Sequence, residues 1–164
     1  MGHFGFSYVG LIYLLLLFLP NIFWVRHLPE GYAYGQLAYK ENKTLVLFER
    51  IGQACVTFTA LVFVDYNLAP LSPWSLWLIA SFVLMILYEL CWVRYFKNGC
   101  TLKNMYSNFC GIPVPLASLP VMAFLLLGIY GKVIWLIVSA VILGIGHVGM
   151  HLVHRQALKD TPVL

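Results

Sequence analysis

Five long apolar stretches, separated by short polar segments, dominate the chain. Each holds about 20 residues with few charges, which is the length that an α-helix needs to cross the hydrocarbon core of a bilayer. The pattern predicts five transmembrane helices, over residues 4–25, 44–64, 73–95, 110–130 and 133–155. No separate soluble domain fits between them. The expected architecture is therefore an all-α bundle in which residues 1–164 form one integral membrane domain.

Prolines modify two of these predicted helices. Pro20 lies late in the first stretch and predicts a kink, because proline removes a backbone hydrogen bond and crowds the preceding turn. Pro113, Pro115 and Pro120 crowd the first half of the fourth stretch. That half is expected to be broken or kinked, with its freed carbonyl groups hydrogen-bonded by neighbouring residues.

Composition and charge agree with a membrane protein. The chain is 62% hydrophobic and only 10% charged, with a mean hydropathy of +0.86. Its pI near 8.9 does not indicate a nucleic-acid partner, because the basic residues lie beside the spans. With five spans, one side of the membrane receives only Lys132. The other side receives Arg26, Lys40, Lys43, Arg94, Lys97, Lys103, Arg155 and Lys159. Loops rich in Lys and Arg remain in the cytoplasm, so the N-terminus is predicted outside and the C-terminus inside.

The last apolar stretch carries an unusual helical face. Ala140, Gly144, His147, His151 and His154 follow a 4, 3, 4, 3 spacing, which puts all five on one side of a helix. The small residues let another helix approach closely, either within the chain or in an oligomer formed through the Ala140/Gly144 face. Ionisable side chains inside a span are costly and indicate a functional site.

Three predicted spans place ionisable residues at similar depths. At 1.5 Å per residue, Glu49 and Glu89 lie about 9 Å inside the predicted cytoplasmic boundary, and His147 about 12 Å inside it. None can face lipid cheaply, so we expect the three to share one polar pocket, where they are candidates for acid–base catalysis. The alternative is structural: hydrogen bonds among these side chains would fix helix packing. Asp65 is expected to be a solvated turn residue.

Further polar residues extend the candidate site. The residues expected to bind a ligand are Arg50, Gln53, Arg94 and His154. His147 and His151, four residues apart on one helix, are candidate ligands for a divalent transition metal ion, with Glu49 or Glu89 completing the coordination. Alternatively, His147 hydrogen-bonds a glutamate while His151 and His154 lie at the wet interface.

Two resemblances bear on identity. The stretches YELCWVRYF, FCGIPVPLASLP and GIGHVGMHLVH resemble small multi-pass bacterial membrane proteins, for which no activity or site residue carries over. This resemblance implies the bacterial cytoplasmic membrane as the location. Arg26-His27, followed by Pro29, Gly31 and Tyr32, is similar to the RHPxYxG motif of integral membrane methyltransferases such as isoprenylcysteine methyltransferases. Here Leu28 splits the motif, which also follows the first span instead of lying late in the chain.

The sequence therefore predicts a small polytopic membrane protein with a Glu/His pocket in the cytoplasmic leaflet. The expected occupant is a metal ion, a lipid headgroup or a small amphiphile, and the expected surroundings are the lipid bilayer. Three other classes stay open: an enzyme acting on a lipid or isoprenoid, a transporter, and a structural or accessory protein. The outer halves of the spans are nearly free of polar residues, which disfavours a transporter.

Overall fold

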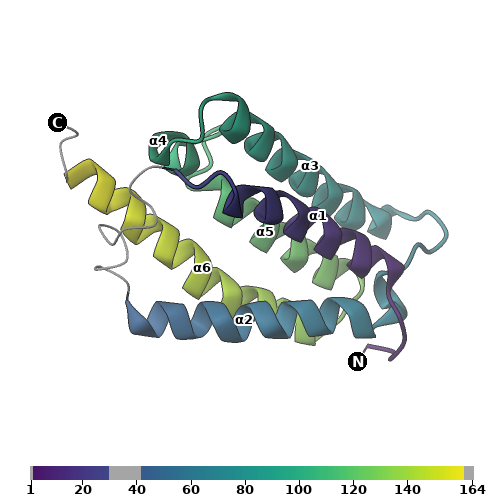
Figure 1. Cartoon of the computed structure of the whole chain (residues 1–164). Coiled ribbons are helices and arrows are strands. Elements are labelled where there is room, and N and C mark those ends of the chain that lie inside the picture. The colour runs from purple at the N-terminus through teal and green to yellow at the C-terminus, as the bar shows by residue number, and fades with distance from the viewer. Residues whose placement is uncertain (1, 30–41, 161–164) are drawn as a thin grey trace.

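The computed structural model describes residues 2–29 and 42–160 (Figure 1). Lys40, as well as Gly31 and Tyr32 of the methyltransferase-like motif, lie outside the described residues. The described part folds into helices and contains no β-strand beyond two isolated bridges. Its elements are α1 (Tyr8–Val25), α2 (Lys43–Val62), η2 (Val64–Tyr66), η3 (Pro73–Ser75), α3 (Leu76–Lys97), α4 (Leu102–Tyr106), α5 (Pro115–Tyr130) and α6 (Ile134–Asp160).

Four helical segments are long and apolar enough to cross a membrane. They are α1, α2, α6 and the segment Pro73–Lys97, which consists of η3 and α3. The predicted all-helical architecture is therefore confirmed for the described residues, with four candidate membrane-spanning helices. α5 is apolar but has only 16 residues, and it begins at Pro115 instead of residue 110. Residues 110–114 form turns in which Cys110 and Val114 have positive φ, and Pro115 occupies the first helical turn, where its missing N–H costs nothing.

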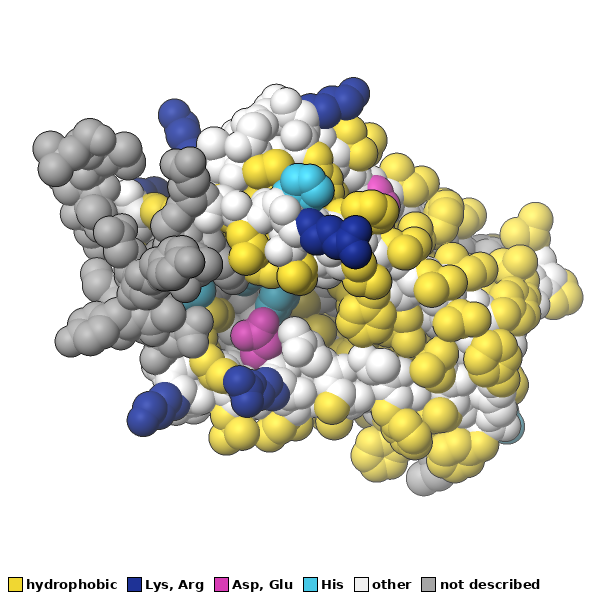
Figure 2. All heavy atoms as spheres, viewed as in Figure 1, with side chains coloured by type: hydrophobic (Ala, Val, Ile, Leu, Met, Phe, Trp, Pro, Cys, Tyr) yellow, Lys and Arg dark blue, Asp and Glu magenta, His cyan; other side chains and the backbone are white. Residues whose placement is uncertain are grey.

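The short helix α5 lies at the centre of the bundle. It packs against α3 on one side and α6 on the other, and Leu119, Phe124 and Leu127 are fully buried there (Figure 1). In contrast, the outer faces of the long helices expose large apolar side chains, among them Ile22 and Trp135 (Figure 2). Soluble monomers rarely expose apolar patches of this extent, so these faces are suited to lipid.

Glycines bring α2 and α6 into backbone contact. A Cβ atom on Gly52 would lie 2.4 Å from the Cα of Leu143, and one on Gly146 would lie 2.2 Å from the backbone N of Glu49. Both distances are far inside van der Waals contact, so these two helices approach as closely as they do only because both positions lack a side chain. Gly144 is different: it faces Val121 of α5, and the Ala140/Gly144 face therefore packs within the chain.

Polar contacts close one end of the bundle. Asp65 accepts hydrogen bonds from the backbone N–H of His3 (2.6 Å) and pairs with its Nδ1 (2.8 Å), so it ties down the N-terminal segment and is not the solvated turn residue that the sequence predicted. The Asn67 side chain accepts from the Tyr8 backbone N–H at 3.0 Å. At this same end, the Lys132 ammonium lies 4.9 Å from the centre of a Trp74 ring.

The opposite end carries most of the basic residues. Arg94 donates to the backbone carbonyl of Asn108 (3.0 Å) and to the hydroxyl of Ser107 (2.6 Å), which holds the segment around α4 against the end of α3. Tyr95 donates to the carbonyl of His27 (2.9 Å), just beyond α1. Among the described residues, the two ends of the bundle thus differ in charge.

Candidate functional site

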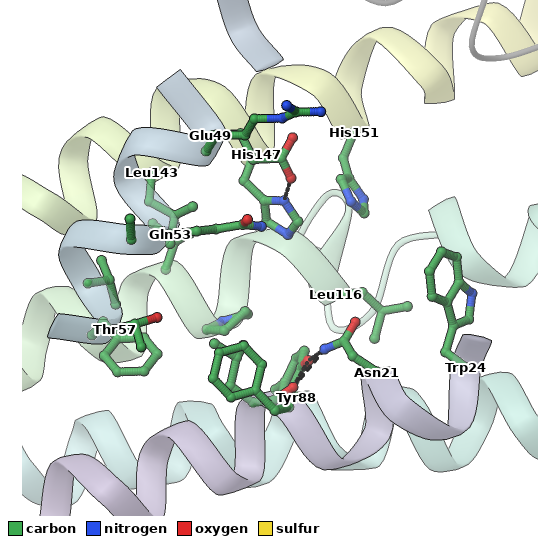
Figure 3. Close-up of a pocket in the computed structure, with 18 of the residues that line it drawn as sticks. Asn21, Trp24, Glu49, Gln53, Thr57, Tyr88, Leu116, Leu143, His147 and His151 are labelled. Atoms are coloured by element: carbon green, nitrogen blue, oxygen red, sulfur yellow. Dashed lines mark hydrogen bonds and ion pairs between the residues drawn. The ribbon is translucent and has the colours of Figure 1, made fainter. Parts of the chain in front are cut away.

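A cavity of about 910 Å³ lies between α1, α2 and the central helices. Its walls come from α1, α2, α3, α5 and α6, with one residue from α4. Apolar side chains form most of the lining. The polar ones are Asn21, Glu49, Arg50, Gln53, Thr57, Tyr88, His147 and His151 (Figure 3). The volume is at the upper end of the range for sites that bind small molecules, about 300–1,000 Å³.

The cavity exists because α1 and α2 meet at only one end. There, a Cβ atom on Gly10 would overlap the carbonyl oxygen of Ala60, and the backbone N–H groups of Gly5 and Ser7 donate to carbonyls of Val62 and Leu61 at 2.9 Å. Towards the basic end the two helices diverge (Figure 1). Figure 2 shows the resulting hollow, in which acidic and histidine side chains are visible, with hydrophobic side chains among those at its border.

Glu49 and His147 form a direct pair inside the cavity. The Nδ1 atom of His147 lies 2.5 Å from a carboxylate oxygen of Glu49, and both side chains are about one-fifth exposed, at 23% and 22%. Gly146, next to His147, sits against the Glu49 backbone, so the contact between α2 and α6 fixes where the pair forms. The second ring nitrogen of His147 points into the cavity beside the Gln53 side chain (Figure 3).

His151 continues the polar face of α6 from His147. The two rings lie 4.6 Å apart between centroids, and the ring of Tyr106 lies 5.4 Å from His151. The Nδ1 atom of His151 is buried and has no hydrogen-bond partner among the described residues. Tyr106 in turn pairs through its hydroxyl with Nδ1 of His154 at 3.0 Å, and His154 is buried, not exposed at a wet interface.

A second polar group lies on the opposite wall. The Asn21 amide donates to the Tyr88 hydroxyl (2.9 Å) and to the carbonyl of Leu17 (2.6 Å), and the Tyr88 hydroxyl donates to that same carbonyl (3.2 Å). Figure 3 shows this pair across the cavity from Gln53 and His147. The sequence analysis missed both residues. The available signal was Asn21 itself, a strongly polar side chain within an otherwise apolar helix.

The structure divides the predicted site residues into two groups. Glu49, His147, His151, Arg50 and Gln53 all line the cavity. The others do not: Glu89, Arg94 and His154 are absent from the lining.

Glu89 has no hydrogen bond to Glu49 or His147, and its Oε1 atom is buried without a partner among the described residues. Its neighbour Tyr88 faces the cavity instead, about 100° away around the helix. The structure therefore brings together two of the three residues expected to share a pocket. Arg94 instead donates a hydrogen bond to Ser107 beside α4, and His154 pairs with the hydroxyl of Tyr106.

The metal site expected at His147 and His151 is not supported by a set of neighbouring ligands in the described residues. Within residues 2–29 and 42–160, no three His, Cys, Asp or Glu side chains are grouped as a metal ion would require. His147 directs one nitrogen to Glu49, and the His151 ring lies beside it at an interplanar angle of 58°. The arrangement is suited instead to hydrogen bonding and to proton transfer with a molecule in the cavity.

No protein-family model, curated protein or solved structure matches this chain significantly.

Proposed function

We propose that this protein binds one amphiphile from the surrounding bilayer, with the polar group of the ligand at Glu49, Gln53 and His147. The observation that carries this proposal is the uneven lining of one cavity: apolar walls over most of its length, and most of the hydrogen-bonding side chains, with all the charged and imidazole ones, near the basic end. A ligand that filled it would need the same division into an apolar chain and a polar head.

The dimensions favour a ligand with a long apolar chain. The lining residues of α2 run from Glu49 to Leu61, a distance of about 18 Å at 1.5 Å per residue. Phe58 and Leu61 from α2, and Leu17 and Phe18 from α1, form the apolar part between the diverging helices. Because these two helices are outermost around the cavity, a membrane lipid can enter sideways between them without leaving the bilayer.

The orientation that we propose for the protein in the membrane places the polar end of the cavity at the level of lipid headgroups. We infer five crossings, with α5 completing the fourth through the turns at 110–114, and with the N-terminus outside and the C-terminus in the cytoplasm. The excess of basic residues at the end near Arg94 supports this orientation. The polar end of the cavity then lies in the cytoplasmic leaflet, where a lipid headgroup would reside. A reporter fused to the C-terminus is expected to be active in the cytoplasm, and an external reporter would contradict the orientation.

The binding test uses the two tryptophans that line the cavity, Trp24 and Trp92. Replacing Trp74, Trp77 and Trp135 with Phe leaves these two as the only tryptophans of the chain. Titration of this protein in detergent with dibrominated stearate is expected to quench its fluorescence saturably, at one ligand per chain, because bromine quenches only at short range.

A matched pair of variants gives the control. Ala54 lines the cavity, whereas Ala80 is exposed on α3 outside it. Ala54→Phe is expected to reduce the saturable quenching strongly, and Ala80→Phe to leave it unchanged. Quenching that rises linearly with the brominated lipid, or that is equal in the two variants, would show that the cavity is not a binding site.

A transporter receives less support. Transport requires the site to reach both ends of the protein in turn. Here the segment just before α1 is joined to α2 by backbone hydrogen bonds at the end near Asp65, and the charged and imidazole side chains of the lining, Glu49, Arg50, His147 and His151, lie in the other half of the cavity. Ligand binding from one leaflet accounts for both features.

A further inference from the structure

We propose that His147 is a general base, held in place by Glu49, which activates water to hydrolyse an ester bond of the bound amphiphile. The inference rests on the proposed function, because it needs the ligand in the cavity. It adds a reaction to that binding, and it gives the chemical class of the substrate as an ester with a long apolar acyl chain.

The pairing of His147 defines which nitrogen is available. A carboxylate only accepts hydrogen bonds, so the Nδ1 atom that faces Glu49 carries the proton of the neutral imidazole. The other nitrogen, Nε2, then presents its lone pair, and it points into the cavity (Figure 3). A carboxylate that orients a histidine whose second nitrogen faces the substrate is the base–orienter arrangement of many hydrolases. A pair that served only to join α2 and α6 would not need that nitrogen in an open, ligand-sized space.

The reaction balances with water as the only co-reactant. His147 Nε2 takes a proton from water as the water oxygen attacks the ester carbonyl carbon, forming a C–O bond and a negatively charged tetrahedral oxygen. That intermediate collapses, the bond from carbon to the alkoxy oxygen breaks, and the imidazolium returns its proton to the departing oxygen. The products are a fatty acid and an alcohol, and His147 is restored to its neutral form.

The neighbouring side chains suit these steps. The Gln53 side chain lies beside His147, where its amide N–H can donate to the carbonyl oxygen as negative charge develops (Figure 3). Glu49 carries negative charge next to the imidazolium when that cation forms. The other ionisable groups of the cavity lining are Arg50 from α2, Tyr88 from α3 and His151 from α6, while α1 and α5 contribute none. Glu49 is therefore the carboxylate that orients the base, and we assign it a positioning role.

The test measures release of p-nitrophenol from p-nitrophenyl laurate by the full chain in detergent, with p-nitrophenyl acetate as the short-chain comparison. The wild type is expected to hydrolyse the laurate faster than the acetate, because only the laurate fills the apolar part of the cavity. His147→Gln is expected to lower kcat by a factor of about 100 or more, as is typical for loss of a general base. Glu49→Gln is expected to lower kcat as well and to displace the acid limb of the pH–rate profile.

Two matched variants separate catalysis from general damage. His27 and Glu89 lie outside the cavity lining, so His27→Gln and Glu89→Gln are expected to retain wild-type rates and the wild-type pH profile. Equal losses in the cavity variants and these controls would overturn the proposal, as would a pH profile that Glu49→Gln does not move.

A chemical measurement covers the case in which His147→Gln does not fold. Diethyl pyrocarbonate acylates an imidazole nitrogen that carries a free lone pair. On the wild-type protein it is therefore expected to modify His147 and to abolish hydrolysis. Bound oleate is expected to prevent both the modification and the loss of activity. Full activity after modification of His147 would overturn the proposal. Saturable quenching by dibrominated stearate without any hydrolysis would overturn the reaction but leave the binding function intact, whereas loss of that saturable quenching would overturn both.

Discussion

The close contact between α2 and α6 gives the sharpest test of how the structure builds its site. In Gly146→Ala, the new methyl group would lie 2.2 Å from the backbone N of Glu49 and 2.7 Å from the carbonyl oxygen of Leu45. Neither atom belongs to a side chain that can rotate away. To restore ordinary van der Waals distances, the two helices must separate by roughly 1 Å, which loosens the packing along their whole contact.

A second glycine of the same helix provides the comparison. In Gly149→Ala, the nearest atom to the new methyl group is Cδ2 of Leu45 at 3.1 Å, the far end of a flexible side chain. Both variants make the same chemical change in α6, so the gain in helix propensity of up to about 1 kcal/mol is common to both. The difference between their unfolding free energies therefore reports the overpacking alone, which typically costs about 1–3 kcal/mol.

Equilibrium unfolding in mixed micelles with increasing dodecyl sulfate measures that difference. Gly146→Ala is expected to be less stable than Gly149→Ala by about 1–3 kcal/mol. It is also expected to weaken quenching by dibrominated stearate, because Glu49 moves away from His147. Two variants of equal stability, within about 0.5 kcal/mol, would refute the reasoning that backbone contact between α2 and α6 holds the site together.

Two further outcomes follow from polar contacts outside the Glu49–His147 pair. Burial disfavours the charged form of Asp65, but the hydrogen bonds from His3 outweigh it and hold the pKa of this carboxyl below its usual value of 3.8. The stabilisation is therefore present above that value and is lost as pH falls through the lower, folded-state pKa. Hydrogen exchange in residues 2–7, corrected for the intrinsic rate, is expected to accelerate below this pH in the wild type, whereas Asp65→Asn is expected to abolish the acid-dependent step. Tyr106→Phe removes the buried hydroxyl that pairs with His154 and is expected to lower the unfolding free energy by about 1 kcal/mol, measured by dodecyl sulfate titration, and an unchanged midpoint would contradict that role.

The sequence placed Glu49, Glu89 and His147 at one depth and favoured a hydrogen bond between His147 and Glu89, whereas the structure pairs His147 with Glu49. Depth along each helix follows from the helix ends, and in α6 the alternation of small residues and histidines also specifies which way the face points. For Glu49 and Glu89 only depth was available. The sequence of α3 is apolar on all sides, so it does not indicate which face of the helix is turned towards the bundle. In the structure, Tyr88 and Trp92 line the cavity where Glu89 was expected.

Contacts between distant segments were beyond sequence reasoning. His3 and Asp65 lie 62 residues apart, and neither belongs to a periodic pattern that would indicate the other. Likewise, His154 was expected near water from its place at the end of a span, but Tyr106 of the short helix α4 covers it. The Asn21–Tyr88 contact, 67 residues apart, is a third example, and it supplies one wall of the cavity.

The cavity and the Glu49–His147 pair have a common origin in the placement of close helix contacts. Gly52 and Gly146 join α2 to α6 along the half of α2 that carries Glu49, while Gly10 joins α1 to α2 only near Ala60 at the other end. The contact between Asn21 and Tyr88 then holds the far part of α1 against α3 instead of α2. Since α2 is held to one side and α1 to the other, the two helices diverge towards the basic end, and the Glu49–His147 pair lines the cavity between them (Figure 1). In the proposed function, a ligand that enters between these two helices meets the Glu49–His147 pair at that end.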